Sequence, residues 1–130
     1  CKCDAAGIDC FGTEPYICHG TIGAKFLRAG AVEWGISADE IEPYARVCER
    51  HTGAGLTADD IRRQNLPLPE RDLMPETMME KLVCYADKFF SKTHPEKEKA
   101  LEKVRRSMQK FGEASLMRFE ELHTLFSSQH

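Results

Sequence analysis

Apolar residues recur along the chain at intervals of three and four positions, which is the period of an amphipathic helix. The pattern predicts an all-α fold, because no stretch shows the alternation of apolar and polar residues that is typical of a strand. Helices are expected over residues 16–29, 37–51, 57–65, 76–90, 95–111 and 113–126. Helices of this number and length favour one helical bundle of about five to six helices.

Capping residues and glycines place the ends of several helices. Ser37 is followed three positions later by Glu40, and Thr57 by Asp60. Both pairs match an N-terminal cap, in which a side chain satisfies a free backbone N–H of the first turn. Gly30 is expected to end the first helix, because glycine readily leaves the helical conformation.

The length of 130 residues predicts a single domain, since a chain of this size buries roughly two thirds of its unfolded surface. Residues 1–16 show no sustained period and are expected to form a loop, followed by the bundle over residues 17–126. The three prolines of residues 66–75 predict an ordered, non-helical connector. No apolar run reaches the roughly 18 residues of a membrane span, and no signal-peptide pattern opens the chain. We therefore expect a cytoplasmic protein without a membrane partner.

The net charge and the cysteines limit which partners and metal sites we expect. The net charge of −3 gives no basic field over the whole chain, so nucleic acid is not expected as a partner. Cys48 and Cys84 lie on apolar helix faces and are expected in the core as reduced thiols. Zinc held by Cys1, Cys3 and Cys10 is the alternative, although their spacing differs from the paired motif of zinc ribbons.

The helix predicted over residues 76–90 is the most apolar segment of the chain. Its apolar residues cover more than one face, which predicts a central position in the bundle. Asp87 lies within it, and an unpaired carboxylate in such surroundings would cost several kcal/mol. Asp87 therefore needs a metal, a hydrogen-bonding partner or a cation. The alternative to a functional role is a wet edge of the helix, where Asp87 pairs with Lys88 or a nearby arginine.

Two histidines accompany this acid. His51 is expected at a helix end, because Gly53 and Gly55 follow it at once, and His19 falls in the first turn of an earlier helix. Taken singly, each is typical of a capping or core residue. Because bundled helices can point such side chains into one cleft, His19, His51 and Asp87 together suit a divalent metal. The charged residues 97–106 are instead interpreted as a solvated helical face with i,i+4 pairs, and not as a binding patch.

The order of three segments resembles the HD-domain metal-dependent phosphohydrolases, in particular a small branch of bacteria and archaea. These segments are residues 16–24 around His19, residues 46–56 around His51 and residues 85–88 around Asp87. The His-Thr-Gly-Ala-Gly run that begins at His51 is the most specific part. The resemblance covers residues 11–126 and implies an all-α bundle of the HD type.

The resemblance implies that Asp87 matches the family's distant metal-ligating and catalytic aspartate. His19 and His51 match two histidines that hold a second metal or the substrate phosphate in some branches. The His-Asp doublet that holds the principal metal is absent from the chain. The resemblance therefore implies the C-terminal part of an HD domain, incomplete at its N-terminus.

The function implied by the resemblance is hydrolysis of a phosphate ester or nucleotide by metal-activated water. One or two divalent ions (Mn, Fe, Mg, Zn or Ni) would serve as cofactor, and the partner would be a small phosphorylated substrate. Arg50 and Lys88 would contact the phosphate, against the alternative that both are ordinary exposed helix charges. The alternative function is a truncated or degenerate helical domain without catalysis, with a structural or partner-binding role. A homo-oligomer is an open option.

Overall fold

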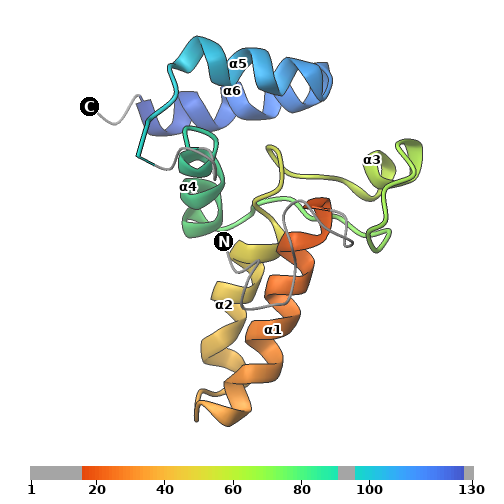
Figure 1. Cartoon of the computed structure of the whole chain (residues 1–130), viewed down its shortest axis with the longest axis vertical. Coiled ribbons are helices and arrows are strands. Elements are labelled where there is room, and N and C mark those ends of the chain that lie inside the picture. The colour runs from red at the N-terminus through yellow and green to blue at the C-terminus, as the bar shows by residue number, and fades with distance from the viewer. Residues whose placement is uncertain (1–15, 91–95, 128–130) are drawn as a thin grey trace.

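The computed structural model describes residues 16–90 and 96–127, and in this part of the chain the fold is all-helical (Figure 1). This confirms the all-α prediction. After a short 3-10 helix, η1 (Tyr16–Cys18), the helices are α1 (His19–Glu33), α2 (Ala38–Glu49), α3 (Ala58–Arg63), α4 (Met78–Asp87), α5 (Leu101–Lys110) and α6 (Glu113–Ser127). The expected loop of residues 1–16 lies almost entirely outside the described residues, and the single domain over the whole chain stays a prediction.

Helices α1 and α2 form a tight antiparallel hairpin that projects away from α5 and α6 (Figure 1). Small residues allow the close approach. Gly20, Gly23 and Ala24 of α1 are buried, and Ala45 of α2 is fully buried. A Cβ atom built on Gly20 would lie only 2.5 Å from the backbone oxygen of Cys48. The two helices are thus in contact through their backbones at the end that carries His19.

The first helix runs past Gly30, so the prediction that it ends there is wrong. The ring of Trp34 lies over Gly30, where an added Cβ would come within 2.4 Å of it. Gly30 is therefore used for close packing and not as a stop. The chain turns instead at Gly35, whose φ of +71° is a left-handed conformation that favours glycine.

The apolar core of the other half lies between α4, α5 and α6. Val104 and Met108 of α5 and Phe119 of α6 are buried together with Ala54. Tyr85 of α4 stacks on Phe119 with ring centroids 5.7 Å apart. These contacts join α4 to the α5–α6 pair.

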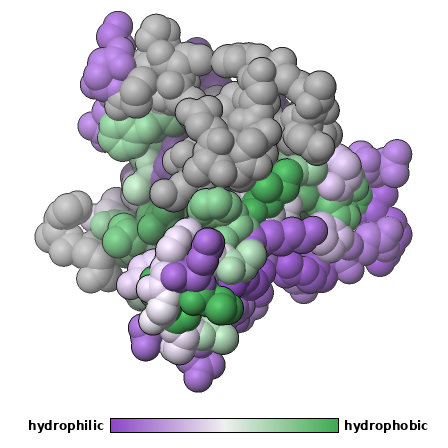
Figure 2. All heavy atoms as spheres, turned by 60° about the horizontal axis from the view of Figure 1, so that its bottom comes forward, coloured by the Kyte–Doolittle hydropathy of each residue, from purple (hydrophilic) through white to green (hydrophobic). Residues whose placement is uncertain are grey.

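Helix α4 contacts both α2 and α6 and so lies between the two halves, but it is less buried than predicted. Its buried residues are Glu80 and Cys84, whereas Met79, Leu82 and Val83 are 39%, 49% and 38% exposed. The physical reason is that α4 turns its Cys84 side toward the chain after α2, where the thiol lies 3.4 Å from the Gly53 carbonyl oxygen. Hydrophobic areas are visible at the surface beside hydrophilic ones (Figure 2).

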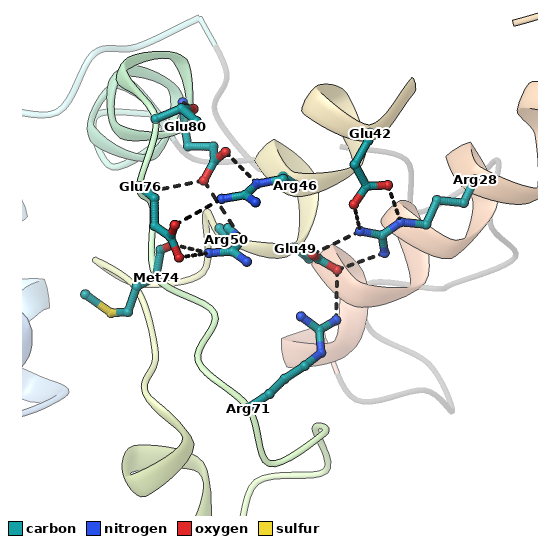
Figure 3. A network of polar contacts seen from close by, with 10 residues as sticks. Arg28, Glu42, Arg46, Glu49, Arg50, Arg71, Met74, Glu76 and Glu80 are labelled. Atoms are coloured by element: carbon teal, nitrogen blue, oxygen red, sulfur yellow. Dashed lines mark hydrogen bonds and ion pairs between the residues drawn. The ribbon is translucent and has the colours of Figure 1, made fainter. Parts of the chain in front are cut away.

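Two networks of ion pairs fasten the hairpin to its surroundings (Figure 3). In one, Glu49 of α2, only 3% exposed, accepts hydrogen bonds from Arg28 of α1 and from Arg71 of the connector, and Arg28 also binds Glu42. The expected connector is non-helical and ordered, and it pairs with the chain after α2 through a bridge between Leu56 and Leu73.

The second network joins α2 to α4. Arg46 donates to the buried carboxylate of Glu80 at 2.9 Å. Arg50 donates to Glu76 and to the backbone oxygen of Met74, both at 2.8 Å. The hairpin, the connector and α4 are therefore held by charged contacts where apolar packing is sparse. No helix in the described part of the chain is long and apolar enough to cross a membrane.

Candidate functional site

The candidate site is a pocket of about 310 Å³ where α1, α4, α5 and α6 approach the chain that follows α2. Its polar residues come from several segments, and its apolar wall comes from the start of the described chain, the connector and the α5–α6 turn. Lining residues are Ile17, His19, His51, Thr52, Gly53, Leu56, Gln64, Leu66, Asp87, Lys88, Phe111 and Ser115. The structure thus brings the three predicted site residues, His19, His51 and Asp87, to one cavity.

His19 and His51 are in direct contact. Their Nε2 atoms are 2.8 Å apart, and the rings meet edge to face at 79°. The Nδ1 atom of His51 lies within hydrogen-bonding distance of the Cys48 carbonyl oxygen, which can only accept. Nδ1 of a neutral His51 therefore carries the proton, and its Nε2 accepts a hydrogen bond from Nε2–H of His19. The pair holds one proton between the two Nε2 atoms.

Burial lowers the pKa of His51 below the ordinary value of 6.5, with Asp87 opposing the shift in part. We expect nitrogen-edited NMR to show the Nδ1–H tautomer of His51 and a titration midpoint below 6.5. Because its folded-state pKa is lowered, His51 takes up a proton more readily in the unfolded chain. Its contribution to stability is therefore full at neutral pH and decreases as the pH falls through 6.5. A midpoint at or above 6.5 would contradict this assignment.

Asp87 and Lys88 form the other polar side of the pocket. The Lys88 side chain is only 7% exposed, and its Nζ donates to the His51 carbonyl oxygen at 2.7 Å and to Asp87 at 3.0 Å. Asp87 ends α4, and its side chain is 51% exposed. Burial raises the pKa of Asp87, but Lys88 and His51 together offset this and hold the pKa below its usual range. The pairing of Asp87 with Lys88, which was the alternative to a functional role, is thus present.

Arg50, the other predicted phosphate contact, is absent from the residues that line the pocket. Its guanidinium is held by Glu76 and by the Met74 carbonyl oxygen. Phe111, Gln64 and Ser115 are lining residues that the sequence interpretation missed. The only available signal was an apolar side chain, Phe111, directly before the helix-ending Gly112.

The described residues contain no group of three or more histidine, cysteine, aspartate or glutamate side chains placed to hold a metal ion. The two histidines share a proton, and the Asp87 carboxylate is paired with Lys88. The alternative zinc site of Cys1, Cys3 and Cys10 lies outside the described residues. Cys18, Cys48 and Cys84 form no disulfide.

Comparison with known proteins finds two similar proteins that are named for the modification of tRNA. Two relatives are each named a tRNA (cytidine(56)-2'-O)-methyltransferase. The chain is 40% identical over 73 residues to the protein of Picrophilus torridus, which is 56% of this chain and 18% of the relative. It is 28% identical over 113 residues to that of Thermoplasma volcanium, which is 86% of this chain and 30% of the relative.

A third relative is an uncharacterized protein of Methanocaldococcus jannaschii, 41% identical over 69 residues, which is 53% of this chain and 35% of that protein. The chain thus spans about a fifth to a third of the length of these relatives. No protein-family model and no solved structure matches it.

These relatives correct several predictions. The resemblance to HD-domain phosphohydrolases is contradicted, because the named relatives are methyltransferases. Hydrolysis of a small phosphorylated substrate and the divalent metal cofactor are contradicted with it. The expectation of no nucleic-acid partner is contradicted by relatives that are named for tRNA. The broader prediction of an enzyme agrees with the names of these two relatives.

Proposed function

We propose that this chain is a helical, RNA-contacting part of an enzyme that acts in tRNA 2'-O-methylation. The observation that carries the proposal is the similarity to two archaeal proteins named for that activity, one of them matched over 86% of this chain. In this proposal the described residues bind and position RNA, and the pocket that contains His19, His51 and Asp87 receives one nucleotide of the tRNA.

The pocket suits a nucleoside because it has an apolar and a polar side. Phe111, 63% exposed, and Leu66 offer surfaces against which a base can stack or pack. Asp87 supplies a half-exposed carboxylate that can accept hydrogen bonds from ribose hydroxyls. Its pKa is held below the usual range, so it remains an acceptor at neutral pH.

Methyl transfer to a ribose hydroxyl also requires a methyl donor, for which S-adenosylmethionine is the usual group. The glycine turn in the described residues does not provide a place for such a cofactor. The glycine turn of Gly53 and Gly55 leads into α3, a helix of six residues whose N-terminal N–H groups already bind Thr57 and Asp72. We therefore derive no chemical step through the donor from these residues.

The proposal predicts that the 130-residue chain binds tRNA and that pocket variants weaken the binding. His51→Ala removes the acceptor of the histidine pair, and Phe111→Ala removes the stacking surface. We expect Phe111→Ala to raise the Kd for an in vitro transcribed tRNA by about 5-fold or more, since base–aromatic stacking contributes about 1–3 kcal/mol. We expect His51→Ala to raise the Kd as well, because it disrupts the polar side of the pocket. Fluorescence anisotropy of labelled tRNA measures the effect.

Met117→Ala is the matched control, because Met117 is equally exposed, at 64%, and does not line the pocket. It should leave the Kd unchanged. The proposed function is overturned if the unaltered chain binds tRNA no more tightly than an unrelated helical protein of similar charge. A His51→Ala variant with the Kd of the unaltered chain would remove the pocket from the proposal.

A further inference from the structure

The solvent-facing side of α5 carries three cations at regular spacing. Lys103, Arg106 and Lys110 are all exposed. Their separations of three and four positions place them within about 60° of one another around the helix axis and spread them over about 10 Å along it. We call these three residues the α5 basic stripe.

Among the described residues, the ion pairs of α5 are made by Arg105 and not by the cations of the stripe. Arg105, on another side of α5, pairs with Glu102 at 2.7 Å and with Glu120 of α6 at 2.6 Å. No carboxylate in residues 16–90 or 96–127 forms an ion pair with any cation of the stripe. The expected intrahelical pairing of residues 97–106 therefore applies to Arg105 and not to the stripe.

The stripe also leads to the pocket. Lys110 is the last residue of α5, and the next residue is Phe111, whose ring lines the cavity beside His51 and Asp87. A strand whose phosphates follow the stripe would thus reach the end of α5 where Phe111 lines the pocket. Proteins that bind single strands combine these two features, a positively charged track for the backbone and an aromatic side chain for a base.

Resting on the proposed function, we infer that the α5 basic stripe binds the phosphate backbone of the RNA whose nucleotide enters the pocket. The three side chains are spread over about 10 Å of α5, so they can contact successive phosphates of one strand. The other polyanionic partner, an acidic protein segment, would lack the base for the aromatic surface of Phe111.

The test uses the 130-residue chain, labelled tRNA and a titration of KCl. A triple variant carries glutamate in place of Lys103, Arg106 and Lys110. Its Kd should be at least 10-fold higher near 0.15 M salt. The slope of log K against log salt should be smaller in magnitude by about 2, because three phosphate contacts are removed.

For single substitutions, Lys103→Glu is compared with Lys25→Glu. Both are exposed lysines on helices and neither has an ion pair among the described residues.

The inference is supported if Lys103→Glu weakens binding and Lys25→Glu does not. It is overturned, with the proposed function intact, if the triple variant binds tRNA with the affinity and salt slope of the unaltered chain. Equal weakening by Lys25→Glu also overturns it, since a general charge effect would then explain the loss. Circular dichroism checks the fold. If the glutamate variants unfold, the corresponding glutamine variants test the same contacts.

Discussion

Replacing Gly20 by alanine is expected to destabilise the protein by about 1–3 kcal/mol, the usual cost of overpacking. A Cβ at this position would lie 2.5 Å from the Cys48 backbone oxygen, and backbone cannot swing away as a flexible side chain does. Helices α1 and α2 would have to separate at the end where His19 contacts His51. Thermal and denaturant unfolding measure the loss, and NMR of the imidazoles reports on the histidine pair.

Gly23→Ala is the matched control. Gly23 is buried in the same helix, three residues further on, but its added Cβ would lie 3.9 Å from Cys48, an ordinary contact distance. Because alanine is favoured over glycine in a helix by about 0.5–1 kcal/mol, Gly23→Ala should be neutral or slightly stabilising. If Gly20→Ala proves no less stable than Gly23→Ala, close backbone contact does not hold the hairpin.

Local signals in the sequence predicted most helices well and their packing poorly, although α5 begins at Leu101 and not at the predicted residue 95. Thr57 and Asp60 form the expected capping box, because a cap depends on residues three positions apart. The role of Gly30 depends on Trp34 folding back over it, which a helix-stop rule does not consider. The apolar content of α4 indicated burial, but which face of a helix is covered depends on its neighbours, and Leu82 remains 49% exposed.

For the candidate site, too, the sequence predicted one part and missed another. The grouping of His19, His51 and Asp87 in one pocket was predicted from helix ends and from a resemblance. The chemistry attached to that grouping was wrong, because residue types alone do not distinguish a metal site from a polar pocket. In the structure the buried amino group of Lys88 pairs with Asp87, and the named relatives are methyltransferases. Phe111 was missed because its neighbours in the pocket are far away in the sequence.

Asp60→Asn is expected to destabilise the protein by about 2 kcal/mol at pH 7. The Asp60 side chain, 6% exposed, accepts hydrogen bonds from the Thr57 N–H at 3.0 Å, from Arg63 at 2.9 Å and from Arg118 of α6 at 2.7 Å. One carboxylate thus caps α3 and fastens it to α6. Burial raises the pKa of Asp60, but the hydrogen bonds from Thr57 and Arg118 and the charge of Arg118 outweigh it and lower the pKa from 3.8 to about 2.

The pH dependence of the unfolding free energy distinguishes the contribution of the Asp60 charge from that of its side-chain shape. Because the folded-state pKa is lowered, the stabilisation is full above about pH 4 and is lost as the pH falls from 4 toward 2. The difference in unfolding free energy between the unaltered chain and Asp60→Asn should therefore shrink over that interval. Asp59→Asn is the control, since Asp59 is 65% exposed and pairs only with surface arginines, so its removal should cost no more than about 0.5 kcal/mol. If the unfolding free energy of Asp60→Asn lay as far below that of the unaltered chain at pH 2 as at pH 7, the ionised carboxylate would not hold α3 to α6.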